Sequence, residues 1–150
     1  MRRHLSLTWG AERIAGDVSR FRLWAPDLDA LSLATPAGDL GMASAPGGWF
    51  EIETDAVPLG GDYAFRLPSG HAVPDPAARA QADDVHGPSR LVDPRAYVWQ
   101  VPDWPGRPWE EAVIAEVHVG TLTREGTFRA AIDALDHYAA AGFTAIELMP

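Results

Sequence analysis

The chain has 150 residues and carries 12 basic against 21 acidic side chains, which gives a formal net charge of −9 at pH 7 with histidine neutral. This charge disfavours partners that attract clusters of lysine and arginine, so we expect no binding to nucleic acid or to an anionic membrane. The chain contains no cysteine, which excludes disulfides, zinc–thiolate sites and cysteine nucleophiles.

The N-terminal residues do not have the pattern of a secretory signal. The start is basic, but the apolar run that follows, residues 5–9, is short and polar, and Glu12 and Arg13 come soon after it. No apolar run approaches the roughly 20 residues that a membrane-spanning helix needs. We therefore expect a cytoplasmic protein.

The first part of the chain predicts a β-sandwich, which we place within residues 1–70. Phe21 and Leu23 alternate with polar residues, as in a strand with one buried face. Turn signals recur roughly every ten residues, a spacing typical of small sandwiches. The predicted strands are residues 19–25, 30–34, 49–53 and 62–67.

Two tryptophans of these strands, Trp24 and Trp49, lie on the face opposite the apolar alternation. An exposed indole offers an apolar surface on which a sugar ring can stack, so both are candidate substrate-binding residues. The alternative is that they seal an interface between the sandwich and a following domain.

Residues 71–112 form a connector rich in proline and tryptophan. Stretches of this length without regular structure are uncommon in compact domains unless they are functional or packed down. We expect an ordered connector and not a flexible tether, seated on its neighbours by large aromatic side chains that bury much area. These side chains are Tyr97, Trp99, Trp104 and Trp109.

Residues 113–150 predict a strand, a helix and a second strand. Residues 113–119 are rich in β-branched residues, which favours a buried strand. From Thr127 the apolar spacing becomes helical, with Thr127 as N-cap and Gly142 as the residue that ends the helix. Residues 143–149 then form an almost continuous apolar run, as in a parallel strand that is covered on both faces.

The predicted helix carries one apolar stripe. A single βαβ unit cannot cover both faces of a parallel sheet, so we expect residues 113–150 to be the truncated start of a barrel or doubly wound sheet. The stripe consists of Phe128, Ala131, Ile132, Leu135 and Ala139.

Motifs spread over nearly the whole chain resemble, in order, those of one enzyme family. The loop from 74–79 to 85–89 is the most specific of them. The motifs are FRLWAP at 21–26, GDY at 61–63, PDPAAR at 74–79, VHGPS at 85–89, EVHVGT at 116–121, GTF at 126–128 and IELMP at 146–150. Together the series resembles the N-terminal portion of the malto-oligosyltrehalose trehalohydrolases, members of the α-amylase superfamily (glycoside hydrolase family 13).

The resemblance implies a mixed fold: an immunoglobulin-like β-sandwich of the early-set, glycogen-binding-module type, followed by the first βαβ unit of a truncated (β/α)8 TIM barrel. It implies hydrolysis of the α-1,4 bond that joins a glucan to a terminal trehalose. The expected partner is therefore maltooligosyltrehalose or a related α-glucan, and no cofactor is expected. Family members use an Asp nucleophile, a Glu acid/base and a second Asp on later barrel strands. The chain lacks those strands, so we expect no catalytic residue in it and no activity from it alone.

Glu116, Glu147 and His118 are the polar residues of the expected barrel strands. Glu116 and Glu147 fall on neighbouring strands, about 4.8 Å apart, but neither lies clearly at a strand's C-terminal end, where barrel active sites form. We expect a hydrogen-bonded network and not a catalytic pair. His118, two positions before the end of its strand and on the face of Glu116, is a candidate sugar contact together with Glu116. The alternative is a histidine whose hydrogen bonds are satisfied within the structure.

The other chemistry-bearing patterns are missing from the sequence. The five histidines are scattered without the spacing of a metal site, and no phosphate-binding loop motif occurs. We therefore expect neither a metal nor a nucleotide cofactor.

Two positions depart from the family pattern, and two other functions stay open. Ala115 stands where the family usually has Tyr, and Leu122 stands where it usually has Phe. The alternatives are a non-catalytic α-glucan-binding module and the N-terminal part of a glycogen branching or debranching enzyme. The incomplete βαβ tail favours a piece of an enzyme over a self-sufficient module, and the loop at 74–89 favours the trehalohydrolases over branching enzymes.

Overall fold

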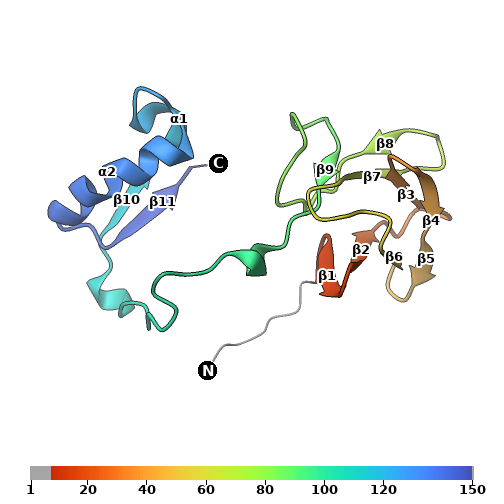
Figure 1. The fold of residues 1–150 in the computed structure, drawn as a ribbon, viewed down its shortest axis with the longest axis horizontal. Helices are drawn as coiled ribbons and strands as arrows, with labels where there is room; N and C mark the ends of the chain where they lie inside the picture. Colours follow the sequence, from red (N-terminus) through yellow and green to blue (C-terminus); the bar gives the residue numbers. More distant parts are fainter. Residues whose placement is uncertain (1–7, 150) are drawn as a thin grey trace. The chain divides into compact units, whose positions relative to one another are not determined.

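The structure is a computed structural model that describes residues 8–149. The chain divides into two units, Met1–Val98 and Trp99–Pro150, and each is described by itself (Figure 1). Within residues 8–149, every helix is too short or too polar to cross a membrane.

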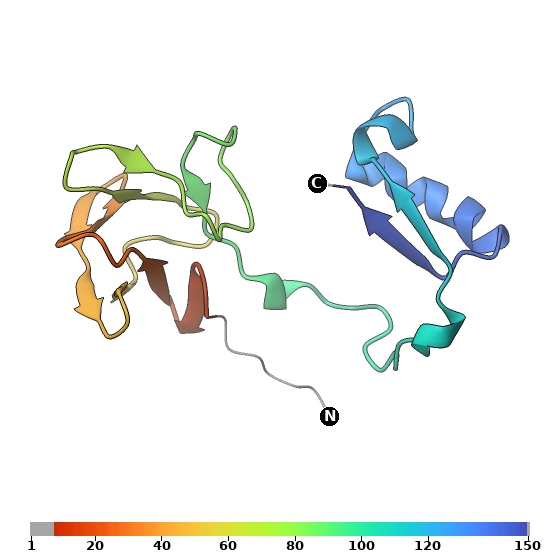
Figure 2. The ribbon, with the colours of Figure 1, turned by 180° about the vertical axis from the view of Figure 1, so that it is seen from behind.

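The first unit is a β-sandwich of two antiparallel sheets, seen from opposite sides in Figures 1 and 2. Its strands are β1 Glu12–Ala15, β2 Val18–Trp24, β3 Ser32–Thr35, β4 Gly38–Gly41, β5 Ala43–Ala45, β6 Trp49–Thr54, β7 Asp62–Arg66, β8 Ala72–Val73 and β9 Ser89–Arg90. One sheet has the order β1-β2-β6-β5. The other has the order β4-β3-β7-β8, and β9 also pairs with β7. The four strands predicted from the sequence correspond to β2, β3, β6 and β7.

The core lies between the two sheets and is built from the alternating apolar residues. Phe21 of β2 is fully buried and meets Tyr63 of β7 edge-on, with 4.9 Å between the ring centroids. Leu33 and Phe65 are register partners on β3 and β7, and both are fully buried. Each such side chain contributes roughly 1.5–3 kcal/mol through its burial. The alternation in the sequence therefore identified the inward faces of both sheets.

The sandwich continues beyond residue 70, where the sequence predicted its end. β8 and β9 pair with β7, and Leu91 is 1% exposed within the core. Strands of two residues have no periodic signal, so the sequence indicated only a connector in this region. Two short 3-10 helices follow, Pro94–Ala96 and Trp109–Glu111. Four aromatic rings of this stretch are exposed in the structure, Tyr97 by 62%, Trp99 by 69%, Trp104 by 64% and Trp109 by 77%. Their packing against both neighbouring domains stays a prediction.

The second unit contains a βαβ arrangement, with two parallel strands side by side and a helix next to them (Figure 2). Its elements are β10 Ile114–Val117, α1 Val119–Leu122, α2 Phe128–Ala140 and β11 Ala145–Leu148. The Thr127 hydroxyl accepts a 3.2 Å hydrogen bond from the Ala130 amide, and Gly142 has a φ of 93° just after the helix. Both predicted ends of the helix are therefore confirmed.

The apolar stripe of α2 is largely exposed within the described residues. Ala131 is buried, whereas Phe128 is 67% exposed, Ile132 64% and Leu135 42%. A pair of strands with one helix buries little apolar area, and two-stranded sheets are marginally stable by themselves. This unit therefore has a weaker core than the sandwich.

We expect the amide protons of β10, α2 and β11 to exchange with solvent at least roughly tenfold faster than those of β2, β6 and β7, because segments with few buried contacts open at lower free energy. Hydrogen–deuterium exchange followed by NMR on the monomeric chain measures this directly. Equal protection of the two units in a monomer would contradict the expectation.

Candidate functional site

Trp24 and Trp49 are direct neighbours on the outer face of the sheet β1-β2-β6-β5. They are register partners across β2 and β6, and side chains at such positions lie close together on the same face. Trp24 is 50% exposed, and its indole N–H donates a 2.9 Å hydrogen bond to the carbonyl oxygen of Gly47. The structure thus brings both candidate residues together, with the Trp24 ring held in place.

A third indole, Trp9, completes a group that we call the tryptophan cluster: Trp9, Trp24 and Trp49. The ring of Trp9 packs on Trp49 with 4.6 Å between centroids and a tilt of 60°. Trp9 is 52% exposed, whereas Trp49 is half-buried. No pattern in the sequence pointed to Trp9, because this residue precedes the first alternating segment.

The guanidinium group of Arg22 also contacts the ring of Trp49. Its carbon atom lies 4.5 Å from the ring centroid, a cation–π geometry. Arg22 forms an ion pair with Glu51 on the neighbouring strand, with 2.7 Å between nitrogen and oxygen. Trp49 is therefore in contact with Trp9 and with Arg22, and it supports the cluster, while Trp9 and Trp24 present more of their surface to solvent.

Further paired charges lie on the same face of this sheet. Arg20 of β2 donates a 2.7 Å hydrogen bond to the carboxylate of Glu12 on β1, and Arg95 lies 3.7 Å from the same carboxylate. Glu12 is only 6% exposed. Since these charges are paired, the face carries polar groups beside apolar rings and no cluster of like charge.

A second polar cluster is buried in the sandwich, around Asp75. The Tyr63 hydroxyl donates a 2.8 Å hydrogen bond to one carboxylate oxygen of Asp75, and the Ala77 amide donates at 2.8 Å to the other. The Asp75 amide in turn donates at 2.9 Å to the Ser89 hydroxyl. Asp75 is 3% exposed and Ser89 is fully buried. Three motifs that lie apart in the sequence therefore meet in one hydrogen-bonded network.

Burial governs the ionisation of this network. It raises the pKa of the Asp75 carboxyl, an effect opposed by hydrogen bonds from the Ala77 amide and the Tyr63 hydroxyl and by the charge of Arg79. Burial, and then the neighbouring Asp75 carboxylate, raises the pKa of Tyr63. The phenol therefore stays protonated, as a hydrogen-bond donor must.

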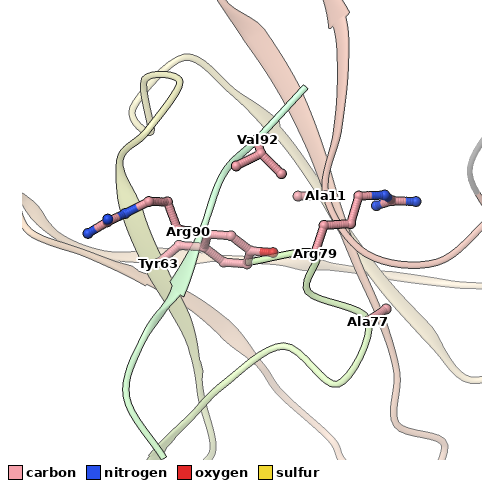
Figure 3. A pocket seen from close by; sticks show the side chains of 6 residues that line it. All are labelled: Ala11, Tyr63, Ala77, Arg79, Arg90 and Val92. Atoms are coloured by element: carbon pink, nitrogen blue, oxygen red, sulfur yellow. The ribbon is translucent and has the colours of Figure 1, made fainter. Parts of the chain in front are cut away.

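The adjacent cavity is too small to hold a sugar. Its volume is about 10 Å³, which is room for about one water molecule. Arg79 and Arg90 lie on different sides of the Tyr63 ring in Figure 3, each with its guanidinium group directed away from the ring. The side chains that line the cavity are Ala11, Tyr63, Ala77, Arg79, Arg90 and Val92. We therefore assign the network around Asp75 to holding the loop on the sandwich.

Glu116 and Glu147 are register partners on β10 and β11, each one residue before the end of its strand. They are thus nearer to the carboxyl end of the strand pair than the sequence indicated. Both side chains are exposed, and the hydrogen-bonded network expected for them within a barrel stays a prediction.

His118 lies one residue beyond β10, and not inside the strand as predicted. Its carbonyl oxygen accepts hydrogen bonds of 3.0 Å from the amides of Thr121 and Leu122, so it is the N-cap of α1. Its ring is exposed and lies close to Gly120, where an added Cβ would be 2.9 Å from a ring carbon. Residues 118–119 have a sequence typical of a strand, but in the structure they begin α1. The predicted strand therefore ended two residues too late. Within residues 8–149, no three His, Asp or Glu side chains gather as a metal site would require.

The chain is similar in sequence to malto-oligosyltrehalose trehalohydrolases of several organisms. It is 39% identical to the enzyme of Deinococcus radiodurans over 142 residues, which are 94% of this chain and 23% of the relative. It is 38% identical to that of Saccharolobus solfataricus over 131 residues, 87% of this chain and 23% of the relative. A glycogen debranching enzyme of Dickeya chrysanthemi is 38% identical over 96 residues, 57% of this chain and 14% of the relative. The chain thus spans about a quarter of the length of the trehalohydrolases that it matches.

Solved structures share the architecture. A crystal structure of a candidate alpha amylase from Salmonella typhimurium has a TM-score of 0.89 and 49% identity, over 97% of this chain and 25% of that one. The apo pullulanase of Paenibacillus barengoltzii has a TM-score of 0.71 at 24% identity, over 98% of this chain and 27% of that one, a likeness of fold alone. No protein-family model matches the chain.

Proposed function

Because the chain corresponds to a segment of the malto-oligosyltrehalose trehalohydrolases, we propose that it is part of a glycosidase that releases trehalose from maltooligosyltrehalose. The bond hydrolysed is the α-1,4 bond next to the trehalose unit. The observation that carries the proposal is the extent of the match. Two trehalohydrolases match 94% and 87% of the chain, whereas the debranching enzyme matches 57% of it.

In this proposal β10, α2 and β11 are the first βαβ unit of a (β/α)8 barrel. Parallel strands are normally covered on both faces, and here Glu116 and Glu147 are exposed on one face of the strand pair. The exposed stripe of α2, with Phe128 and Ile132, is a further apolar surface that more barrel elements would cover. The support for the barrel is thus the parallel register and the apolar area left uncovered.

The chain supplies no catalytic residue in this proposal. A retaining glycosidase uses two carboxyl groups roughly 5–5.5 Å apart that differ in protonation. Glu116 and Glu147 are register partners, but both side chains are exposed and neither lies in a pocket of the described residues. We assign to this segment the sandwich and the start of the barrel, and we place the reacting carboxylates outside it.

A chimera tests the proposal. The chain replaces the matching segment of the Deinococcus radiodurans trehalohydrolase, and release of trehalose from maltotriosyltrehalose is measured. We expect the chimera to release trehalose and the 150-residue chain alone to release none. The matched control places the same residues in the Dickeya chrysanthemi debranching enzyme, where we expect no debranching of glycogen.

Two results would contradict the proposal. Trehalose release by the chain alone would place catalytic residues within it. A folded but inactive trehalohydrolase chimera, beside a debranching chimera that acts on glycogen, would favour the debranching alternative.

A free-standing α-glucan-binding module is the second function that an observation favours. That observation is the tryptophan cluster, in which Trp9 and Trp24 are half exposed. Such a module would bind glucan without any contribution from a barrel.

A further inference from the structure

We propose that the tryptophan cluster is a binding site for an α-1,4-glucan chain. The site itself stands on the geometry of Trp9, Trp24 and Trp49, whereas the choice of an α-glucan as its ligand rests on the proposed function. All three indoles belong to the first unit, so the site needs no residue of the βαβ unit.

The chemistry of the cluster suits a sugar. A glucose ring has apolar C–H faces and a rim of hydroxyl groups, and an indole offers a large apolar face with a polar edge. Trp9 and Trp24 are each about half exposed, at 52% and 50%. Two such indoles, with Trp49 in contact with one of them and in register with the other, present apolar surface to successive sugar rings.

The rings are ordered before any ligand arrives. The hydrogen bond from the indole N–H of Trp24 to Gly47 fixes one ring, at 2.9 Å. Trp49 is held by Trp9 and by the guanidinium of Arg22. Binding to rings that are already fixed loses little side-chain entropy, which favours a shallow site of this kind.

The polar neighbours of the cluster suit a neutral ligand. The ion pair between Arg22 and Glu51 places donors and acceptors for hydroxyl groups beside Trp49. These charges are already paired, and the chain has a net charge of −9, so an anionic ligand is disfavoured. An uncharged polyol can form hydrogen bonds with these polar groups while it covers the indole rings.

The tilt of the rings bears on the shape of the glucan. Trp9 and Trp49 are inclined by 60° and do not form a level strip, which disfavours a flat, β-linked glucan.

Titration of the full 150-residue chain with maltoheptaose, followed by NMR, tests the site. The chain has six tryptophans and hence six indole N–H signals. We expect the signals of Trp9 and Trp24 to shift on binding, whereas that of Trp109, which is 77% exposed outside the cluster, stays in place. Cellohexaose is the matched ligand with β-linkages, and we expect it to shift none of them.

Variants give the size of the effect by calorimetry. We expect Trp24→Ala to weaken maltoheptaose binding by roughly tenfold or more, the scale of an aromatic anchor, and Trp109→Ala to leave it unchanged. The indole signals of the unaltered chain decide the question even where Trp24→Ala fails to fold.

Three results would overturn the site: no shift of any indole signal, an equal shift of Trp109, or equal binding of cellohexaose. The trehalose-release chimera is read separately. An active trehalohydrolase chimera without maltoheptaose binding would refute the site and keep the proposed function. Maltoheptaose binding with a folded but inactive trehalohydrolase chimera would keep the site and refute the function.

Discussion

Replacing Asp75 with alanine is expected to lower the free energy of unfolding of the sandwich by about 3 kcal/mol. The substitution leaves the buried hydroxyl of Tyr63 and the amide of Ala77 without their acceptor. A buried polar group without a partner costs roughly 1–3 kcal/mol. Urea denaturation followed by tryptophan fluorescence measures the loss.

Two further variants separate the contributions to this effect. In Asp75→Asn the amide oxygen still accepts from Ala77 and the amide N–H can donate to the Tyr63 oxygen, so we expect a change within about 1 kcal/mol at neutral pH. Tyr63→Phe removes a single donor and should fall between the other two variants. An Asp75→Ala chain as stable as the original would show that the network does not hold the loop.

The difference in unfolding free energy between the original chain and Asp75→Asn is expected to depend on pH. Burial raises the pKa of Asp75 in the folded state, so its contribution to stability is fully present below the unfolded pKa of about 3.9 and is lost as pH rises through the raised folded value. The original chain should therefore gain stability relative to Asp75→Asn on acidification within that window. A difference that is independent of pH, or that grows with pH, would contradict this account.

Gly48→Ala is expected to destabilise the sandwich by about 3 kcal/mol or more. Gly48 has a φ of +83°, and a Cβ there would lie 2.6 Å from the Cβ of Pro26 and 2.8 Å from its Cα. A left-handed conformation costs a non-glycine residue roughly 1–2 kcal/mol, and overpacking typically adds roughly 1–3 kcal/mol. Thermal and urea unfolding of the variant measure the loss.

The preceding residue is a matched control. Gly47 has nearly the same φ, +81°, but a Cβ there would meet only a ring carbon of Trp49, at 3.7 Å. Gly47→Ala should therefore show the conformational cost alone, roughly 1–2 kcal/mol. Equal losses of unfolding free energy at the two positions would contradict this prediction. They would mean that Pro26 moves away from the added Cβ and that the close approach costs no stability.

Much of the sandwich was predictable because its central strands have strong local patterns. The alternation around Phe21 and Phe65 identified both inward faces, and Thr127 and Gly142 marked the ends of α2. β4 and β5 were not predictable, since they consist mainly of glycine, alanine and other residues with weak strand preference. They become strands by pairing with β3 and β6, which is a property of the fold and not of their own sequence.

The candidate site was predictable in part, for the same reason. Alternation placed Trp24 and Trp49 on one face of the sheet, and the register confirms this. Trp9 lies outside any periodic segment, so only the folded chain shows its contact with Trp49. No pattern in the sequence links Asp75 to Tyr63, because the two residues are 12 positions apart.

The pairing of β9 with β7 has a consequence for synthesis on the ribosome. Leu91, which follows β9, is part of the core, and its amide and carbonyl groups bond to Gly61 and Gly60. A nascent chain that has emerged only as far as residue 70 therefore exposes part of that core, and the sheet closes only after the following 20 or so residues leave the exit tunnel. Release of a chain stopped in this interval would yield an aggregation-prone sandwich with an open edge beside β7.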